Sequence, residues 1–137
     1  MVIHITTAYA LRALLFMARR FPEMTTAREI VSELNIPNKY VRRLITRLSK
    51  AGFIRSQQGR NGGYVFIKSP DQINVMDLMV AMNDIAVLQN CILGFENCSD
   101  THPCALHTYW AEIRKQMQEL FKVSTLSHLL QNQQVKI

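Results

Sequence analysis

The chain has 137 residues, of which 48% are hydrophobic and 19% are charged, and it carries a net charge of +6. Its length is that of about one domain, and its composition excludes an intrinsically disordered chain. No apolar run approaches the roughly 18 residues of a membrane-spanning helix, and the first residues lack the layout of a secretory signal, so we expect a cytoplasmic protein.

Two capped helices are predicted first. Thr6 or Thr7 can cap the first helix, and Pro22 ends it because proline disfavours helical backbone in the residue before it. The second helix begins at Thr26, which forms a capping box with Glu29 and precedes apolar residues at helical spacing. A short turn that contains a proline then leads into a third helix.

The third helix has one apolar face and one basic face, and Gly52 follows it as a C-terminal stop. Its apolar face consists of Tyr40, Val41, Leu44, Ile45 and Leu48. The opposite side consists of Lys39, Arg42, Arg43, Thr46 and Lys50, with Arg47 at its margin. This amphipathic pattern predicts a helix that packs on a core and presents positive charge outward.

Two short strands, residues 53–57 and 64–68, are predicted after the third helix. Gly59, Gly62 and Gly63 between them tolerate the positive φ angles of a tight turn. Two helices, a short turn, a basic helix and a hairpin together predict a winged helix-turn-helix. The expected fold class is therefore mainly α with a small β-hairpin.

The rest of the chain is predicted to hold a short helix, a loop and a long helix. Asn74 and Asp77 can cap the short helix, residues 89–104 have the poor periodicity of a loop, and the long helix runs from about residue 104 to 122. We expect three parts: a winged helix-turn-helix DNA-binding region at 1–83, a cysteine-rich loop at 84–104, and a dimerisation helix with a tail at 105–137.

The long helix bears on stoichiometry. Its apolar stripe spans roughly four turns, and a chain of this size has little left to cover it, so we expect a homodimer. Folding back onto the first helix is the alternative for part of the stripe. A dimer would present two recognition helices about 34 Å apart to a palindromic operator. The stripe consists of Leu106, Tyr109, Trp110, Ile113, Met117, Leu120 and Phe121.

The charge is concentrated in the winged region. Residues 1–80 contain 12 Lys and Arg against 5 Asp and Glu, whereas residues 81–137 contain 4 against 5. This asymmetry favours double-stranded DNA as the partner, although charge alone leaves a merely solvated basic surface open. We expect base contacts from Asn38, Lys39, Arg42 and Arg43, backbone contacts from Arg47, Lys50, Thr26 and Arg28, and a minor-groove contact from Arg60.

Three cysteines, Cys91, Cys98 and Cys104, lie within 14 residues of one another. An odd number of cysteines in a chain without an export signal argues against a disulfide framework and favours a metal or redox site. Thiolates suit an iron–sulfur cluster or zinc, and His107, one helical turn after Cys104, is the nearest fourth donor. His102 is the less favoured donor because Pro103 fixes the chain beside it. Iron–sulfur is favoured over zinc, and the absence of any metal stays open.

The combination of these features resembles the Rrf-type family of winged-helix regulators, which includes IscR and NsrR. The similarity covers nearly the whole chain. The matching residues are Tyr9-Ala10-Leu11-Arg12, Ile36-Pro37 through Leu48 with Ala51-Gly52, Gly62-Gly63-Tyr64, and the three cysteines with His107.

The resemblance implies a homodimer with crossing long helices and an iron–sulfur cluster in each subunit. In IscR-like members the ligands are three cysteines and one histidine, which correspond to Cys91, Cys98, Cys104 and His107. NsrR-like members take the fourth ligand from an aspartate of the partner's first helix, and this chain has Ala8 at that position. We expect [2Fe–2S] to be slightly favoured over [4Fe–4S].

At three places the sequence departs from those relatives, which limits how far their residue roles can be carried over to this chain. Six residues separate Cys91 from Cys98 where five are familiar, which leaves the cluster type open. Arg42 replaces an acidic residue of the recognition helix, so we expect a different operator. Gln58 stands where the relatives have arginine before the wing glycine, and Arg60 is a possible substitute.

The sequence therefore predicts a transcription regulator, specifically a repressor, whose operator binding is controlled by an iron–sulfur cluster. The alternative is a cluster-free or zinc-stabilised winged-helix repressor of the same family. An enzyme is not expected, because the sequence shows no nucleophile–base pair, phosphate-binding loop or paired carboxylates in a recognisable setting.

Overall fold

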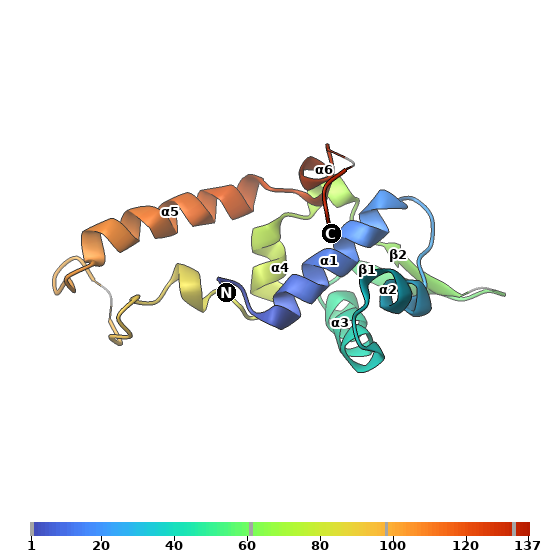
Figure 1. Cartoon of the computed structure of the whole chain (residues 1–137), viewed down its shortest axis with the longest axis horizontal. Coiled ribbons are helices and arrows are strands. Elements are labelled where there is room, and N and C mark those ends of the chain that lie inside the picture. Colours follow the sequence, from blue (N-terminus) through green and yellow to red (C-terminus); the bar gives the residue numbers. More distant parts are fainter. Residues whose placement is uncertain (1, 61, 98, 133) are drawn as a thin grey trace.

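The computed structural model describes residues 2–60, 62–97, 99–132 and 134–137. Within them the chain is mainly helical, with one antiparallel hairpin, as expected (Figure 1). The helices are α1 (Ile5–Arg19), α2 (Ala27–Leu34), α3 (Asn38–Lys50), α4 (Val75–Ala81), α5 (His107–Val123) and α6 (Leu126–Leu129). The strands are β1 (Ile54–Gln57) and β2 (Gly63–Phe66), and single 3-10 turns cover Pro70–Gln72 and Ala86–Leu88.

The helix starts follow the capping chemistry, with one correction. Both predicted capping boxes form, Thr26 with Glu29 at α2 and Asn74 with Asp77 at α4. The expectation that Thr6 or Thr7 caps α1 is wrong, because the cap is His4, whose side chain accepts from the Thr6 N–H. The helix therefore starts two residues earlier than a Thr6 cap would allow, and an imidazole nitrogen replaces a hydroxyl oxygen as the acceptor.

The end of α3 is set by Gly52, as predicted. Gly52 has a φ of +79°, a left-handed conformation that favours glycine. The Phe53 N–H bonds to the Leu48 carbonyl at 3.1 Å and the Gly52 N–H bonds to the Ser49 carbonyl at 3.1 Å. These two bonds form a Schellman motif, which ends the helix and directs the chain into β1.

The main core lies between α1, α2, α3 and β1. Apolar residues at helical spacing on each helix meet there, and Ile54 of β1 is completely buried among them. Leu126 of α6 belongs to the same core, and its N–H bonds to the Ile73 carbonyl at 2.9 Å. The chain thus returns to the winged region after α5. The other fully buried large side chains include Leu14, Met17, Ile30, Leu44 and Leu48.

A second, smaller core joins α4 to α5. Val75, Met79 and Leu88 are buried in it, and Met117 and Phe121 of α5 pack against them. These contacts lie toward the C-terminal end of α5, so the N-terminal part of the helix and the cysteine loop extend away from the winged region (Figure 1).

In the part of the chain that the structure describes, no helix combines the length and the apolar character that crossing a membrane would require.

Candidate nucleic-acid interface and cysteine loop

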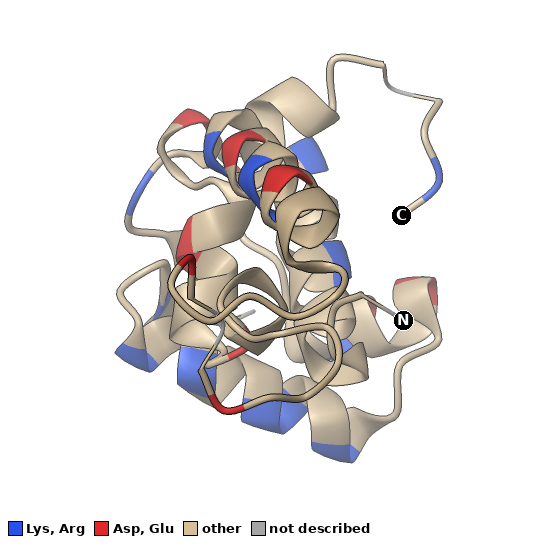
Figure 2. Cartoon of the chain, turned by 90° about the vertical axis from the view of Figure 1, so that its left-hand side faces the viewer, with Lys and Arg blue, Asp and Glu red and all other residues tan. Residues whose placement is uncertain are grey.

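The face of α3 that points away from the core is basic and lacks acidic side chains. Val41, Leu44 and Leu48 face inward and are buried, which leaves the polar side exposed. Figure 2 shows Lys and Arg gathered along the lower edge of the molecule, where α3 lies, whereas α5 above carries charges of both signs. The exposed polar residues of α3 are Asn38, Lys39, Arg42, Arg43, Thr46, Arg47 and Lys50.

The remaining predicted contacts from α2 and α3 have different surroundings. Arg28 lines a cavity of about 250 Å³ between α2 and α3 together with Asn38 and Arg42. The Thr26 hydroxyl is engaged in the capping box, so only part of its hydrogen-bonding capacity remains. The Arg47 guanidinium donates to the Met82 carbonyl at 3.2 Å, which directs it toward the end of α4.

An ion pair supports the start of α2. Arg20 donates to Glu29 at 2.8 Å, and the Thr26 N–H donates to the same carboxylate at 2.7 Å. The hydrogen bond from the Thr26 backbone, followed by that from Arg20, lowers the pKa of Glu29 from its ordinary value. The carboxylate is therefore ionised at neutral pH. It lies in the first turn of α2, where a negative charge interacts favourably with the helix dipole and stabilises the helix.

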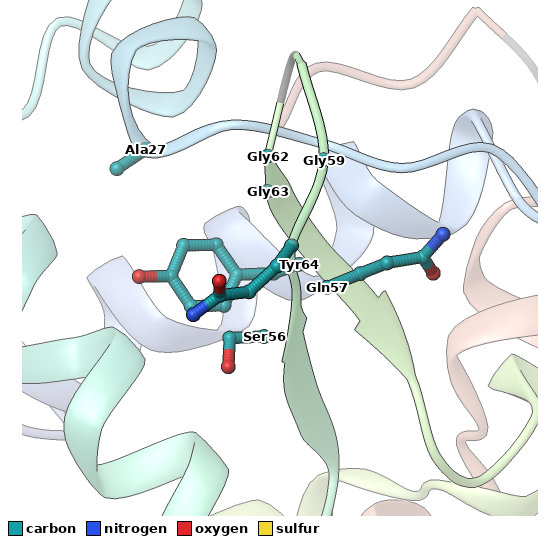
Figure 3. A pocket seen from close by; sticks show the side chains of 8 residues that line it. Ala27, Ser56, Gln57, Gly59, Gly62, Gly63 and Tyr64 are labelled. Atoms are coloured by element: carbon teal, nitrogen blue, oxygen red, sulfur yellow. The ribbon is translucent and has the colours of Figure 1, made fainter.

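The hairpin is fixed beside the start of α2. Thr25 and Tyr64 exchange two backbone hydrogen bonds of 3.0 and 2.8 Å. A Cβ atom on Gly63 would lie 2.8 Å from the Thr25 carbonyl oxygen, so this close approach requires glycine. Ser56 and Tyr64 point to the side of the hairpin on which Ala27 lies and line a cavity of about 400 Å³ (Figure 3). Arg60 is exposed near the hairpin tip.

The stripe predicted on α5 divides between two adjacent faces. Trp110, Met117 and Phe121 turn toward the subunit, where Met117 and Phe121 complete the second core. A second set of residues, spaced alternately by three and four, points to solvent and includes large apolar side chains. Tyr109 is 73% exposed, Ile113 49%, Leu120 57% and Val123 62%. Part of the stripe thus packs back on its own subunit, mainly against α4 and residues 86–88 rather than along the first helix as considered from the sequence, and the rest faces solvent.

Polar side chains of α5 hold the segment that leads into the cysteine loop. Trp110, Arg114 and Gln118 are spaced four apart and lie on one side of the helix. The Trp110 indole donates to the Asn90 carbonyl at 3.1 Å, and Arg114 donates to the Gln89 carbonyl at 2.8 Å. Gln118 donates to the Leu88 carbonyl at 2.9 Å. Residues 88–90 are therefore fixed along α5, and the loop both starts and ends on this helix.

This closure brings two of the three cysteines together. Cys91 is buried, Cys104 is partly exposed, and their Sγ atoms lie 3.5 Å apart, which is too long for a disulfide between them. Both line a cavity of about 310 Å³, to which His102 also contributes. Cys98, the third predicted ligand, lies outside the described residues.

His107, the predicted fourth ligand, is the first residue of α5 and is buried. Its Nε2 lies 2.8 Å from Oδ1 of Asp100, and it is not among the residues that line the cavity of Cys91 and Cys104. Within the described residues, no three His, Cys, Asp or Glu side chains converge closely enough to hold a metal ion. Of the predicted ligands that the structure describes, Cys91 and Cys104 lie together at one cavity, and His107 pairs with Asp100.

Comparison with known proteins establishes the family. Residues 3–132 match the model of the Rrf2 family, which is described as an iron-dependent transcriptional regulator. The chain belongs to the Rrf2 family. It is accordingly a DNA-binding transcription regulator and not an enzyme, as the sequence predicted.

The alignments with individual relatives cover nearly all of this chain. A putative HTH-type transcriptional regulator from Aquifex aeolicus is 31% identical and covers 95% of this chain and 92% of its own length. The regulator IscR of Erwinia tasmaniensis is 28% identical and covers 94% and 78%. The solved structure of CymR, the global cysteine regulator of B. subtilis, is 29% identical, with a TM-score of 0.73 over 93% and 94%. These similarities support the winged-helix fold as well as the family.

The sequence alone does not point to several residues around the cysteine loop. Asp100 is an ordinary loop residue until the fold places it against His107. From the sequence, Arg114 and Gln118 are expected to be exposed to solvent. Only the interval of four residues from Trp110 to Arg114 and from Arg114 to Gln118 indicates that they share one side of the helix. The predicted DNA contacts of α3, by contrast, come mainly from its charge and helical spacing, and they remain predictions.

Proposed function

We propose that this Rrf2-family chain is a homodimeric repressor whose operator binding is controlled by an iron–sulfur cluster held by Cys91, Cys98, Cys104 and His107. The observation that carries the cluster is the 3.5 Å separation of the Cys91 and Cys104 thiols at a cavity. A repressor acts where the DNA is, so the proposal implies a cytoplasmic location.

The separation of the two thiols fits ligation of one metal centre. Two thiolates on one tetrahedral centre with bonds of about 2.3 Å lie about 3.8 Å apart. Four protein ligands supply two donors to each iron of a [2Fe–2S] cluster but one to each iron of a [4Fe–4S] cluster. The close pair therefore supports [2Fe–2S], which Cys91 and Cys104 would help to hold. Thiolates are soft ligands that suit iron–sulfur clusters, so the two cysteines are suitable donors.

The hydrogen bonds along α5 provide a physical link between the cysteines and the rest of the molecule. Trp110, Arg114 and Gln118 attach the segment before Cys91 to α5, and Cys104 lies just before the start of that helix. When bound, the cluster supplies a cross-link between these two segments that responds to iron supply and oxidation. A shift of α5 would move the two winged regions of a dimer relative to each other. A coupling of about 1–3 kcal/mol is sufficient for regulation.

The exposed stripe of α5 supports the homodimer. The alternating spacing of a coiled-coil seam runs through positions 109, 113, 116, 120 and 123, of which 116 is Gln. The other four, Tyr109, Ile113, Leu120 and Val123, are all more exposed than is usual for large apolar side chains. Packing this face on its counterpart in a second copy would cover both. The resulting two-fold symmetry would match a palindromic operator with half-sites about 34 Å apart.

In each half-site the exposed face of α3 would enter the major groove. Asn38, Lys39, Arg42 and Arg43 are proposed to contact base edges, because polar side chains at the start of a recognition helix reach them. The proposed backbone contacts are Thr26, Arg28, Arg47 and Lys50, and Arg60 at the hairpin tip is proposed to enter the minor groove. The basic, acid-free face of α3 supports this arrangement.

The test is to purify the protein without oxygen and to measure its visible absorption, iron and sulfide. We expect a coloured protein with stoichiometric iron and sulfide, and loss of both in Cys98→Ala without loss of the dimer. His107→Ala and His102→Ala form a matched pair, because only the former should weaken cluster retention. Operator affinity is then compared between the loaded and the cluster-free protein. A colourless wild-type protein without iron would overturn the cluster assignment and leave DNA binding unaffected.

A zinc-stabilised or cluster-free repressor is the second candidate. The same 3.5 Å pair suits two thiolates on zinc, and His107 is not among the described residues that line the cavity. The similarity to CymR, a cysteine regulator, is as high as that to IscR. Zinc in place of iron and sulfide in the protein purified without oxygen would favour the zinc form, and no metal at all would favour the cluster-free form.

A further inference from the structure

The pair formed by His107 and Asp100 is unusual in its burial. The His107 side chain is 8% exposed, whereas that of Asp100 is 101% exposed. An exposed loop carboxylate therefore reaches one nitrogen of a buried imidazole at 2.8 Å. The contact is separate from the start of the helix, where the His107 backbone N–H donates to the Cys104 carbonyl at 3.0 Å.

The chemistry of the two groups decides which nitrogen carries the proton. An ionised carboxylate only accepts hydrogen bonds, so Nε2 of His107 must be the donor. In a neutral imidazole the other nitrogen, Nδ1, then holds the lone pair that a metal requires. Histidines that ligate metals commonly donate their second ring N–H to a carboxylate, which fixes the ring orientation and makes the ligating nitrogen more basic.

We infer that Asp100 is a positioning residue for the cluster, which holds His107 in the tautomer that ligates through Nδ1. The inference rests on the proposed function and extends it to a residue outside the four ligands. Asp100 lies between Cys98 and Cys104 in the chain, so its contact also holds the second half of the loop against the start of α5. His107 and the segment that leads from Asp100 to Cys104 are thus oriented by one hydrogen bond.

The experiment compares Asp100→Ala, Asp100→Asn and the control Glu96→Gln, which removes one negative charge from the same loop. In the cluster-free protein, nitrogen NMR of the His107 ring should show the Nε2–H tautomer in wild type and in Glu96→Gln. Asp100→Ala should give a mixture of tautomers. In the loaded protein, loss of visible absorbance to an iron chelator should be about 10–100-fold faster in Asp100→Ala, as expected for an outer-shell partner. In both measurements Asp100→Asn, which keeps an acceptor oxygen, should lie between wild type and Asp100→Ala.

The possible failures are distinguishable. If wild type loads a cluster and Asp100→Ala retains it as long as Glu96→Gln does, the inference is overturned and the proposed function stands. An unchanged His107 tautomer in Asp100→Ala would also overturn it. If wild type loads no cluster, the proposed function fails and the inference fails with it. Because the Asp100 side chain is exposed, we expect all three variants to fold, which circular dichroism would check.

Discussion

The winged region and α5 differ in how much of their apolar surface is buried within one subunit. In α1, six of 15 residues are buried, and the five apolar ones meet buried residues of α2, α3 and β1. In α5, all of whose 17 residues the structure describes, His107 is the only buried one. Amphipathic helices gain most of their stability from packing of the apolar face. The winged region therefore buries its apolar residues within one subunit. By contrast, α5 leaves apolar side chains exposed, which a partner chain would cover.

The largest effect is expected from a substitution in the exposed stripe of α5. Ile113→Asp would place a carboxylate in the proposed interface, where burying an unpaired polar group costs roughly 2–7 kcal/mol. The dimer dissociation constant should then rise at least about 30-fold. Light scattering after gel filtration would show this as a fall to the monomer mass at micromolar concentration.

The control for that variant is Lys115→Asp, because Lys115 is exposed on a face of α5 outside the stripe. It should leave the mass unchanged, which separates a specific interface from an effect of charge on the helix. A wild-type protein that is monomeric at these concentrations would contradict the proposed dimer, and so would an Ile113→Asp protein that remains dimeric.

A second prediction concerns the winged region, whose exposed face is expected to read DNA. Arg42→Ala should lower operator affinity by about 1–3 kcal/mol, and it should relax the preference at one base position, because a base contact carries sequence information. Binding to the operator and to single-base variants by fluorescence anisotropy would measure both effects. Equal losses on operator and random DNA would show that Arg42 contacts the backbone instead.

The two regions also differ in how well sequence alone predicts them. Periodicity, capping boxes and Gly52 are local signals, and they place α2, α3, α4 and the hairpin within one or two residues. The return of Leu126 to the winged core and the division of the α5 stripe depend on tertiary packing, which local periodicity does not encode. The same holds for Asp100, whose role depends on a contact seven residues along the chain.

A third, smaller effect is expected at Lys50, at the C-terminal end of the recognition helix. Lys50→Ala should weaken binding to operator and random DNA equally, because a phosphate contact carries no sequence information. The slope of log affinity against log salt should fall by about 1, the contribution of one neutralised phosphate. Titrations at three salt concentrations would measure it, and an unchanged slope would remove Lys50 from the interface.

The smallest expected effect tests how the winged region holds its second helix. The pKa of Glu29 is lowered by the Thr26 backbone N–H and by Arg20, so its ionised form stabilises the folded state. A lowered pKa in the folded state gives stability that is fully present above the unfolded value and is lost as the pH falls through the folded value. In the cluster-free protein, Glu29→Gln should therefore lower the melting temperature slightly at pH 7, and the difference from wild type should shrink at pH 3. The matched control Glu33→Gln, exposed on the same helix, should show no such change with pH. If the deficit of Glu29→Gln were equal at both pH values, it would come from packing, and the charge of Glu29 would not stabilise α2.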